Sequence, residues 1–267
     1  MLNETIIEFK NVSYLINNKI INKDICIKIN SGDLVSIIGP NGSGKSTMIK
    51  LVSGEIQPSL GKIFFNKKEI SDWDVNELAC LRSILSQSNM LSFPFLVRDI
   101  IKMGRYPINI SKNHNSISDN EIINKIIKYF DLSDLRYRNY LTLSGGEQQR
   151  VQLARVFAQI WNNKNYSNKL LLLDEPISFL DIYHQIKLFD LLKKLNDRGL
   201  TVVMVLHDIN QAKLYSKKVI MMRKAEVKCF GDVKDTLNEN SIQKIFNINY
   251  KSSFYNLEKN IGAFNGS

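Results

Sequence analysis

The 267-residue sequence has few cysteines and no long apolar run, and these absences exclude several protein classes. Its three cysteines, Cys26, Cys80 and Cys229, lie far apart and form no CxxC pair. We therefore expect neither a zinc site nor a disulfide framework, and free thiols suit a reducing compartment such as the cytoplasm. The longest apolar runs, residues 170–173 and 202–206, are far shorter than the roughly 20 residues that span a bilayer.

The sequence also shows no signal peptide, no internal repeat and no block of like charges. Acidic residues come early, and no apolar stretch of the signal-peptide kind follows the first methionine. Hydrophobic residues make up 44% and charged residues 23%, which predicts a globular protein with a sizeable core. The net charge of +10 has two interpretations: a lysine-rich composition with solvated charges, or attraction to nucleic acid or an anionic membrane surface.

Alternating strand and helix patterns predict an α/β fold with a parallel sheet. Residues 6–14 and 20–29 alternate apolar and polar side chains, as half-buried strands do. Residues 34–38, 170–176 and 201–206 are short and mostly apolar, which is typical of strands buried on both faces. Helices between such strands imply a parallel sheet with helices on its faces.

Helical spacing is present in three further segments. Residues 45–53 form the first and end at Gly54, a plausible C-terminal glycine. Residues 121–130 belong to a long, mostly helical insertion, and residues 183–195 form an amphipathic helix. Residues 61–66 are expected to be another strand.

Residues 39–46, GPNGSGKS, fit the phosphate-loop pattern G-x-x-x-x-G-K-[ST] in full. An apolar strand precedes them and a helix follows, and this context favours a phosphate site over a bare glycine-rich turn. Glycines let the backbone approach phosphate oxygens closely, and the helix N-terminus supplies positive potential. We expect Lys45 to reach the β and γ phosphates and Ser46 to bind Mg²⁺. The predicted nucleotide contacts of this loop are Gly39, Pro40, Asn41, Gly42, Ser43, Gly44, Lys45, Ser46 and Thr47.

Three polar residues at expected strand ends are candidates for the rest of the chemistry. Asp174 follows four leucines and is placed to hold Mg²⁺, and Glu175 comes next, as a candidate general base for the attacking water. His207 ends the strand 201–206 and is a candidate sensor of the γ-phosphate. An acidic turn and a structural histidine are the alternatives. His114 and His184 have no such context, and we expect them on the surface.

The segment LSGGEQQR raises a separate question, because Ser144, Gly145 and Gly146 begin a predicted helix. Ser144 and Glu147 have the spacing of a capping box, which satisfies two free backbone N–H groups. A cap does not explain two glycines, which weaken the first turn of a helix. A helix N-terminus of this kind is an anion site.

The motifs GPNGSGKST, LSGGEQQR, LLLLDEP, SFLD and VLHD occur in this order, and the chain therefore resembles the ATP-binding subunit of an ABC transporter. The resemblance covers about residues 4–235. It implies a P-loop NTPase (RecA-like) core with a parallel sheet, an antiparallel β subdomain and an inserted helical subdomain. The implied division is one domain over 1–235, with its core at about 1–88 and 162–235, the helical subdomain at about 89–161, and a tail over 236–267.

The resemblance also implies roles for single residues and for partners. Tyr14 matches the aromatic residue that stacks on adenine, Gln87 the glutamine that joins the catalytic core to the helical subdomain, and Asp181 the aspartate that ends the loop touching a partner subunit. A neutral amide at Gln87 can contact both Mg²⁺ and the attacking water. His207 matches the switch histidine. Such subunits work as dimers in which two ATP molecules lie between the phosphate loop of one copy and Ser144, Gly145 and Gly146 of the other.

Two segments resemble a subgroup of importers. Residues 92–107, SFPFLVRDIIKMGRYP, are similar to importers of haem, ferric siderophores and cobalamin, and RVQLARVFAQIW at 150–161 resembles the haemin-importer ATPases. The implied partners are two transmembrane permease subunits and, indirectly, a periplasmic substrate-binding protein. The implied place is the cytoplasmic face of a bacterial inner membrane. Ile177 and Phe179 depart from the usual Thr and Ala and weaken the haem assignment.

The remaining alternative is a soluble ABC ATPase that acts on DNA or ribosomes. The ribosomal members carry two cassettes in one chain, and the DNA-repair members carry long coiled-coil insertions. This sequence has one cassette and no sustained heptads, so we expect no nucleic-acid partner.

Overall fold

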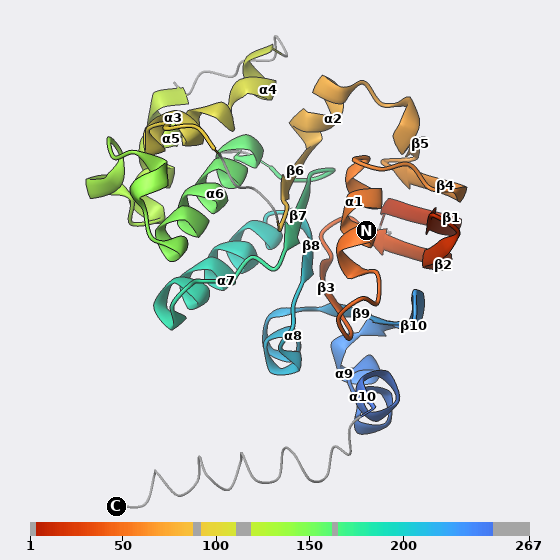
Figure 1. Ribbon diagram of the computed structural model, residues 1–267. Coiled ribbons are helices and arrows are strands. Elements are labelled where there is room, and N and C mark those ends of the chain that lie inside the picture. Colours follow the sequence, from red (N-terminus) through yellow and green to blue (C-terminus); the bar gives the residue numbers. More distant parts are fainter. Residues whose placement is uncertain (1–3, 88–91, 111–118, 162–164, 248–267) are drawn as a thin grey trace, which may run out of the picture.

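Two β-sheets form the framework of the structure, a computed structural model that describes residues 4–87, 92–110, 119–161 and 165–247 (Figure 1). The smaller sheet is antiparallel, in the order β2-β1-β4-β5. Its strands are β1 (Thr5–Ile16), β2 (Lys19–Asn30), β4 (Leu60–Phe65) and β5 (Lys68–Glu69). It confirms the antiparallel β subdomain that the resemblance implied.

The larger sheet has the order β10-β9-β3-β8-β7-β6. Its neighbouring strands are parallel except for β10, which pairs with β9 in the antiparallel direction. The strands are β3 (Leu34–Ile38), β6 (Arg82–Leu85), β7 (Leu170–Asp174), β8 (Thr201–Val205), β9 (Lys218–Arg223) and β10 (Glu226–Asp232). This sheet confirms the predicted α/β class, although β6, β9 and β10 were not predicted.

The four consecutive leucines of β7 show why the central strands are apolar throughout. Leu171 and Leu173 belong to the core on the side of the helical segments, and Leu170 and Leu172 belong to the core shared with the antiparallel sheet. Because successive side chains point to opposite faces, a strand covered on both sides needs an apolar residue at every position.

Helices cover both faces of the larger sheet (Figure 1). The described helices are α1 (Lys45–Ser53), α2 (Val75–Leu81), α3 (Val97–Met103), α4 (Tyr106–Ile110), α5 (Asp119–Tyr129), α6 (Gly145–Ile160), α7 (Ile182–Asn196), α8 (Ile209–Tyr215), α9 (Val233–Thr236) and α10 (Glu239–Phe246). The predicted helices 45–53, 121–130 and 183–195 are confirmed as α1, α5 and α7. Gly54 ends α1 with φ at 72°, the left-handed conformation that favours glycine.

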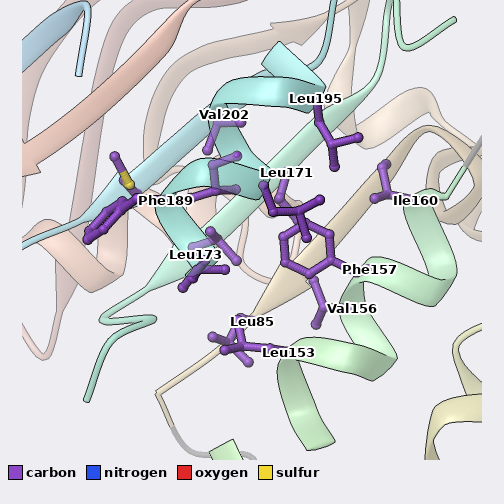
Figure 2. Close-up of a cluster of buried hydrophobic side chains, with 14 of the residues drawn as sticks. Leu85, Leu153, Val156, Phe157, Ile160, Leu171, Leu173, Phe189, Leu195 and Val202 are labelled. Atoms are coloured by element: carbon purple, nitrogen blue, oxygen red, sulfur yellow. The ribbon is translucent and has the colours of Figure 1, made fainter. Parts of the chain in front are cut away.

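Helix α6 joins the helical segments to the larger sheet. Its side chains Leu153, Val156, Phe157 and Ile160 point into the core formed with β6, β7 and α7 (Figure 2). Phe157 is fully buried and packs against Phe130, with the ring centroids 5.4 Å apart. The apolar C-terminal half of α6 therefore anchors the helix whose N-terminus carries the LSGGEQ motif.

The beginning of the predicted tail packs on the core. Helix α10 contacts β9 and buries Ile242 and Ile245. The three cysteines are free, as the sequence predicted. Across the described ranges, no helix combines the length and the apolar character that crossing a bilayer requires.

Shortening Phe157 tests the packing of α6 on the sheet. We expect Phe157→Ala to lower the free energy of unfolding by about 3–5 kcal/mol, because a cavity replaces a fully buried ring. Phe157→Leu fills most of that space and should lose much less. Urea denaturation measures both values, with Tyr137→Ala as the control, since Tyr137 is an exposed aromatic residue. Equal losses for the two Phe157 variants would contradict this packing.

Candidate functional site

The carboxyl edge of the larger sheet gathers the predicted polar residues. The phosphate loop follows β3, His207 follows β8, Glu175 follows β7, and Gln87 follows β6. These four strands are neighbours and run in parallel. Ligands bind at this edge in open α/β sheets because the loops that follow the strands all open there.

The phosphate loop is shaped by glycines with positive φ. The φ angles are 75° at Gly42 and 98° at Gly44, where other L-residues are strained. A Cβ on Gly44 would lie 2.5 Å from the carbonyl oxygen of Ile21, closer than any real Cβ contact. Gly44 therefore lets α1 begin directly beside β2 of the antiparallel sheet.

Lys45 is buried at the start of α1. Its Nζ donates to the carbonyl oxygens of Gly39 at 2.9 Å and Pro40 at 3.0 Å. Burial lowers the pKa of its ammonium, and the carboxylates of Glu175 and Asp174 oppose that shift. The cation lies inside the loop, where a phosphate oxygen would be a stronger, charge-assisted acceptor than a carbonyl.

Asp174 and Ser46 fit a magnesium site. Asp174 is buried at the end of β7, and burial raises the pKa of its carboxyl against an opposing hydrogen bond from Ser46. Its Oδ1 atom has no hydrogen-bond partner among the residues that the structure describes. A buried oxygen of this kind needs a partner, and carboxylate and hydroxyl oxygens are ligands that Mg²⁺ prefers.

Glu175 is held by two side chains from neighbouring strand ends. Its Oε1 accepts from Gln87 Nε2 at 3.2 Å and lies 2.6 Å from His207 Nε2. Glu175 adopts a φ of 51°, which is unusual for a residue other than glycine and is maintained by its surroundings. Glu175, Gln87 and Asp174 line one hollow, and Gln149 of α6 and Phe179 complete it.

Tyr14 lies on β1, directly opposite Asn22 of β2. Asn22 Nδ2 donates to the carbonyl oxygen of Gly44 at 3.3 Å, so the residue that pairs with Tyr14 contacts the phosphate loop directly. Tyr14 is half-buried and packs against the core shared with the antiparallel sheet. Its stacking on adenine stays a prediction. Asn41 is exposed at the loop tip, and Pro40 and Thr47 are half-buried.

The LSGGEQ motif begins α6 with the predicted capping box, which the structure confirms. Ser144 Oγ accepts from the N–H of Glu147 at 3.3 Å, and Glu147 Oε2 accepts from the N–H of Ser144 at 2.8 Å. The structure also explains why residue 146 is a glycine. A Cβ there would lie 2.7 Å from the carbonyl oxygen of Phe179, so the loop at residues 178–181 packs on bare backbone.

The structure does not bring the LSGGEQ motif and the phosphate loop together within one chain. Helix α6 packs on one face of the larger sheet and α1 on the other (Figure 1). Ser144 and Gly146 instead line a surface hollow that also includes Asp181 and His184 and shares Phe179 with the hollow at Glu175.

The sequence did not predict the contacts that Gln149 and Arg150 of α6 make near the site. Gln149 Nε2 donates to the carbonyl oxygen of Pro176 at 3.0 Å and so ties α6 to the loop after Glu175. Arg150 and His184 form a polar cluster, although we expected His184 on the surface. Its side chain is 17% exposed and lines the surface hollow beside Ser144, where it also makes hydrogen bonds that the sequence did not predict. The histidine three residues after Asp181 was the available signal. His114 lies outside the described residues.

The two glycines of the motif provide a matched pair of substitutions. Gly146→Ala should lower the free energy of unfolding by about 1–3 kcal/mol, since the methyl group overlaps the Phe179 carbonyl. Gly145→Ala should leave it unchanged or raise it by up to about 1 kcal/mol, because alanine favours helix and its nearest neighbour is 3.7 Å away. Thermal and urea denaturation measure both, and a reversed order would contradict the packing of this loop.

Comparison with known proteins supports the resemblance to the ATP-binding subunits of ABC transporters. The family model described as ABC transporter matches residues 22–178. The chain is 37% identical over 241 residues to the hemin import ATP-binding protein HmuV of Escherichia coli O157:H7, covering 90% of this chain and 91% of that protein. It is 38% identical over 216 residues to HmuV of Rhizobium meliloti (strain 1021), covering 80% and 81%.

Solved structures agree. A dimeric ATP-binding cassette in a post-hydrolysis state, bound to ADP and Pi, has a TM-score of 0.71 and 29% identity, covering 85% of this chain and 98% of that one. An inward-facing putative metal-chelate type ABC transporter has a TM-score of 0.72 and 27% identity, covering 92% and 90%. The chain therefore belongs to the ABC transporter family of ATP-binding subunits, which couple ATP hydrolysis to transport.

Proposed function

We propose that this chain is the ATP-binding, energy-coupling subunit of a bacterial haem (haemin) importer. The cargo is supported by the two relatives named as hemin import ATP-binding proteins, which match most of this chain. The reaction, ATP hydrolysis by a transport-coupled translocase, is supported by one observation above all. Glu175, His207, Gln87 and the phosphate loop follow four adjacent parallel strands and share one edge.

In this proposal the nucleotide lies along the loop from Gly39 to Thr47. Backbone N–H groups and Lys45 hold its phosphates, and Tyr14 stacks on the adenine. Ser46, Asp174 and Gln87 hold Mg²⁺. The buried, unpaired Oδ1 of Asp174 and the hydrogen bond between Ser46 and Asp174 support this ligand set.

Glu175 is the proposed general base. The donors Gln87 and His207 fix its carboxylate at the carboxyl edge, and a fixed base within reach of water accelerates proton transfer. His207 is the residue proposed to sense the γ-phosphate, since its Nε2 links Glu175 to the end of β8.

A second copy of the chain is the proposed partner at the LSGGEQ motif. Ser144, Gly145 and Gly146 lie away from the chain's own phosphate loop, so they are available for the γ-phosphate bound to another copy. The helix N-terminus supplies the positive potential that such an anion needs. A monomer should therefore hydrolyse ATP slowly.

The transmembrane permease subunits are proposed to bind the helical subdomain, at about residues 89–161. Exposed apolar side chains occur there, including Phe93, Met103 and Tyr106. A surface hollow is lined by Asp99, Lys102, Met103 and Tyr106. Docking at this face places the chain peripherally at the cytoplasmic face of the inner membrane, where a net charge of +10 is favoured near anionic lipid. A periplasmic binding protein takes part only through the permease.

Replacing Glu175 tests the proposed base. Glu175→Gln keeps the size of the side chain but removes the charge that accepts a proton, so turnover should fall by about 10²–10⁴-fold while ATP binding persists. Phosphate release and nucleotide binding measure the two properties. Glu55→Gln is the control, because Glu55 is a surface carboxylate paired with Lys50. Unchanged turnover in Glu175→Gln would remove Glu175 from this role.

Deleting the gene tests the cargo. We expect the deletion strain to lose growth on haemin as the sole iron source and to recover it when the intact gene, but not the Glu175→Gln variant, is returned. Normal growth on haemin would contradict the haem assignment. Parallel cultures on a ferric siderophore or on cobalamin would then identify which alternative cargo depends on this ATPase.

A further inference from the structure

His184 lies partly buried on the first turn of α7, between the loop 178–181 and helix α6. We propose that His184 is a positioning residue for ATP hydrolysis, which fixes the loop 178–181 against the LSGGEQ helix through Asp181 and Arg150. This inference rests on the proposed ATPase function and adds a residue to its machinery.

On one side the imidazole holds Asp181, the last residue of the loop. His184 Nδ1 lies 2.8 and 2.9 Å from the two carboxylate oxygens of Asp181. The Oδ1 atom also accepts the backbone N–H of His184 at 2.8 Å, and these hydrogen bonds lower the pKa of the Asp181 carboxyl. An ionised carboxylate only accepts hydrogen bonds, so Nδ1 must carry the proton.

On the other side the imidazole faces Arg150 of α6. Arg150 Nη1 lies 3.2 Å from His184 Nε2. A guanidinium only donates hydrogen bonds, so in this contact Nε2 is the acceptor, and Nη1 shares its two hydrogens among Nε2 and two carbonyl oxygens at the end of α5. The competing carboxylate, Asp131, is 3.5 Å from Nε2 and already accepts from Lys187 Nζ at 2.6 Å. The Tyr183 ring packs edge-on against the imidazole. This geometry specifies a single tautomer, with hydrogen on Nδ1 only.

Arg150 continues the chain of bonds to the helical segments. The same Nη1 donates to the carbonyl oxygens of Phe130 at 3.1 Å and Asp131 at 2.9 Å, at the end of α5. A polar path therefore runs from α5 through Arg150 and His184 to Asp181.

The loop at the end of this path reaches the base. The N–H of Ser178 donates to the carbonyl oxygen of Glu175 at 3.2 Å, and Phe179 packs on Gly146. Fixing Asp181 fixes a short loop that touches both Glu175 and the LSGGEQ motif. His184 thus links the orientation of the helical segments to the loop that follows Glu175.

Two amide substitutions separate the two bonds of His184. An asparagine amide can reproduce the donor at Nδ1, and a glutamine amide can reproduce the acceptor at Nε2. If both bonds are needed together, His184→Asn and His184→Gln should each lower kcat about tenfold, the size of coupling found within hydrogen-bond networks. The KM for ATP should change less than about twofold, because neither bond is made to the chain's own phosphate loop.

The matched control is Tyr129→Phe. Tyr129 Oη donates to the carbonyl oxygen of Lys187 at 2.9 Å, so this variant removes one bond between α5 and α7 while leaving His184 alone. Its kcat should equal that of the unmodified chain. A kcat within about twofold of the unmodified chain in either amide variant would overturn the two-bond proposal, as would an equal loss in Tyr129→Phe.

Nitrogen NMR of the imidazole rings tests the same geometry without relying on activity or on the folding of a variant. The chain has only three histidines, which simplifies assignment. At about pH 8, above the usual pKa of histidine, His184 should show a protonated Nδ1 and a bare Nε2. The opposite tautomer or an imidazolium would overturn the proposal. If the unmodified chain hydrolysed no ATP, the proposed function would fail, and the tautomer would still report on His184.

Discussion

The parallel pairing of β3, β8, β7 and β6 is the constraint on which the site depends. Because neighbouring parallel strands end at the same edge, the pairing brings together segments more than a hundred residues apart in the chain. The pairing itself is stable because both faces of the sheet are covered, as the alternating burial of the β7 leucines shows. Loss of either cover would therefore disturb the catalytic edge as well as the core.

A second constraint is the close packing of the loop 178–181 against α6. The loop leaves the strand that carries Glu175, touches Gly146 through the Phe179 carbonyl, and ends at Asp181, which His184 holds. On the same helix, Gln149 bonds to Pro176 before the loop and Arg150 bonds to His184 after it. The LSGGEQ helix therefore has two features in one structure: its N-terminus is exposed at Ser144 and Gly145, and its side chains and backbone support the loop that follows Glu175.

The sequence predicted local features well wherever one physical rule dominates. The phosphate loop, the capping box of Ser144 and Glu147, and the glycine after α1 depend on residues next to one another, so their patterns are visible in order along the chain. Strands with less distinctive patterns were missed. β6 has only four residues, and its Arg82 interrupts the apolar run. The Arg150–His184 cluster was missed because its partners come from three separate segments.

The sequence alone determined the class of fold, the phosphate loop and the identity of the acidic and histidine side chains, because these follow from residue type and short-range spacing. Only the tertiary structure decided that Gln87 and His207 meet on one oxygen of Glu175, since strand order is not encoded in any single segment. It also showed why Gly146 carries no side chain and that His184 bonds to both Asp181 and Arg150. Both depend on contacts between distant segments, which spacing along a chain does not contain.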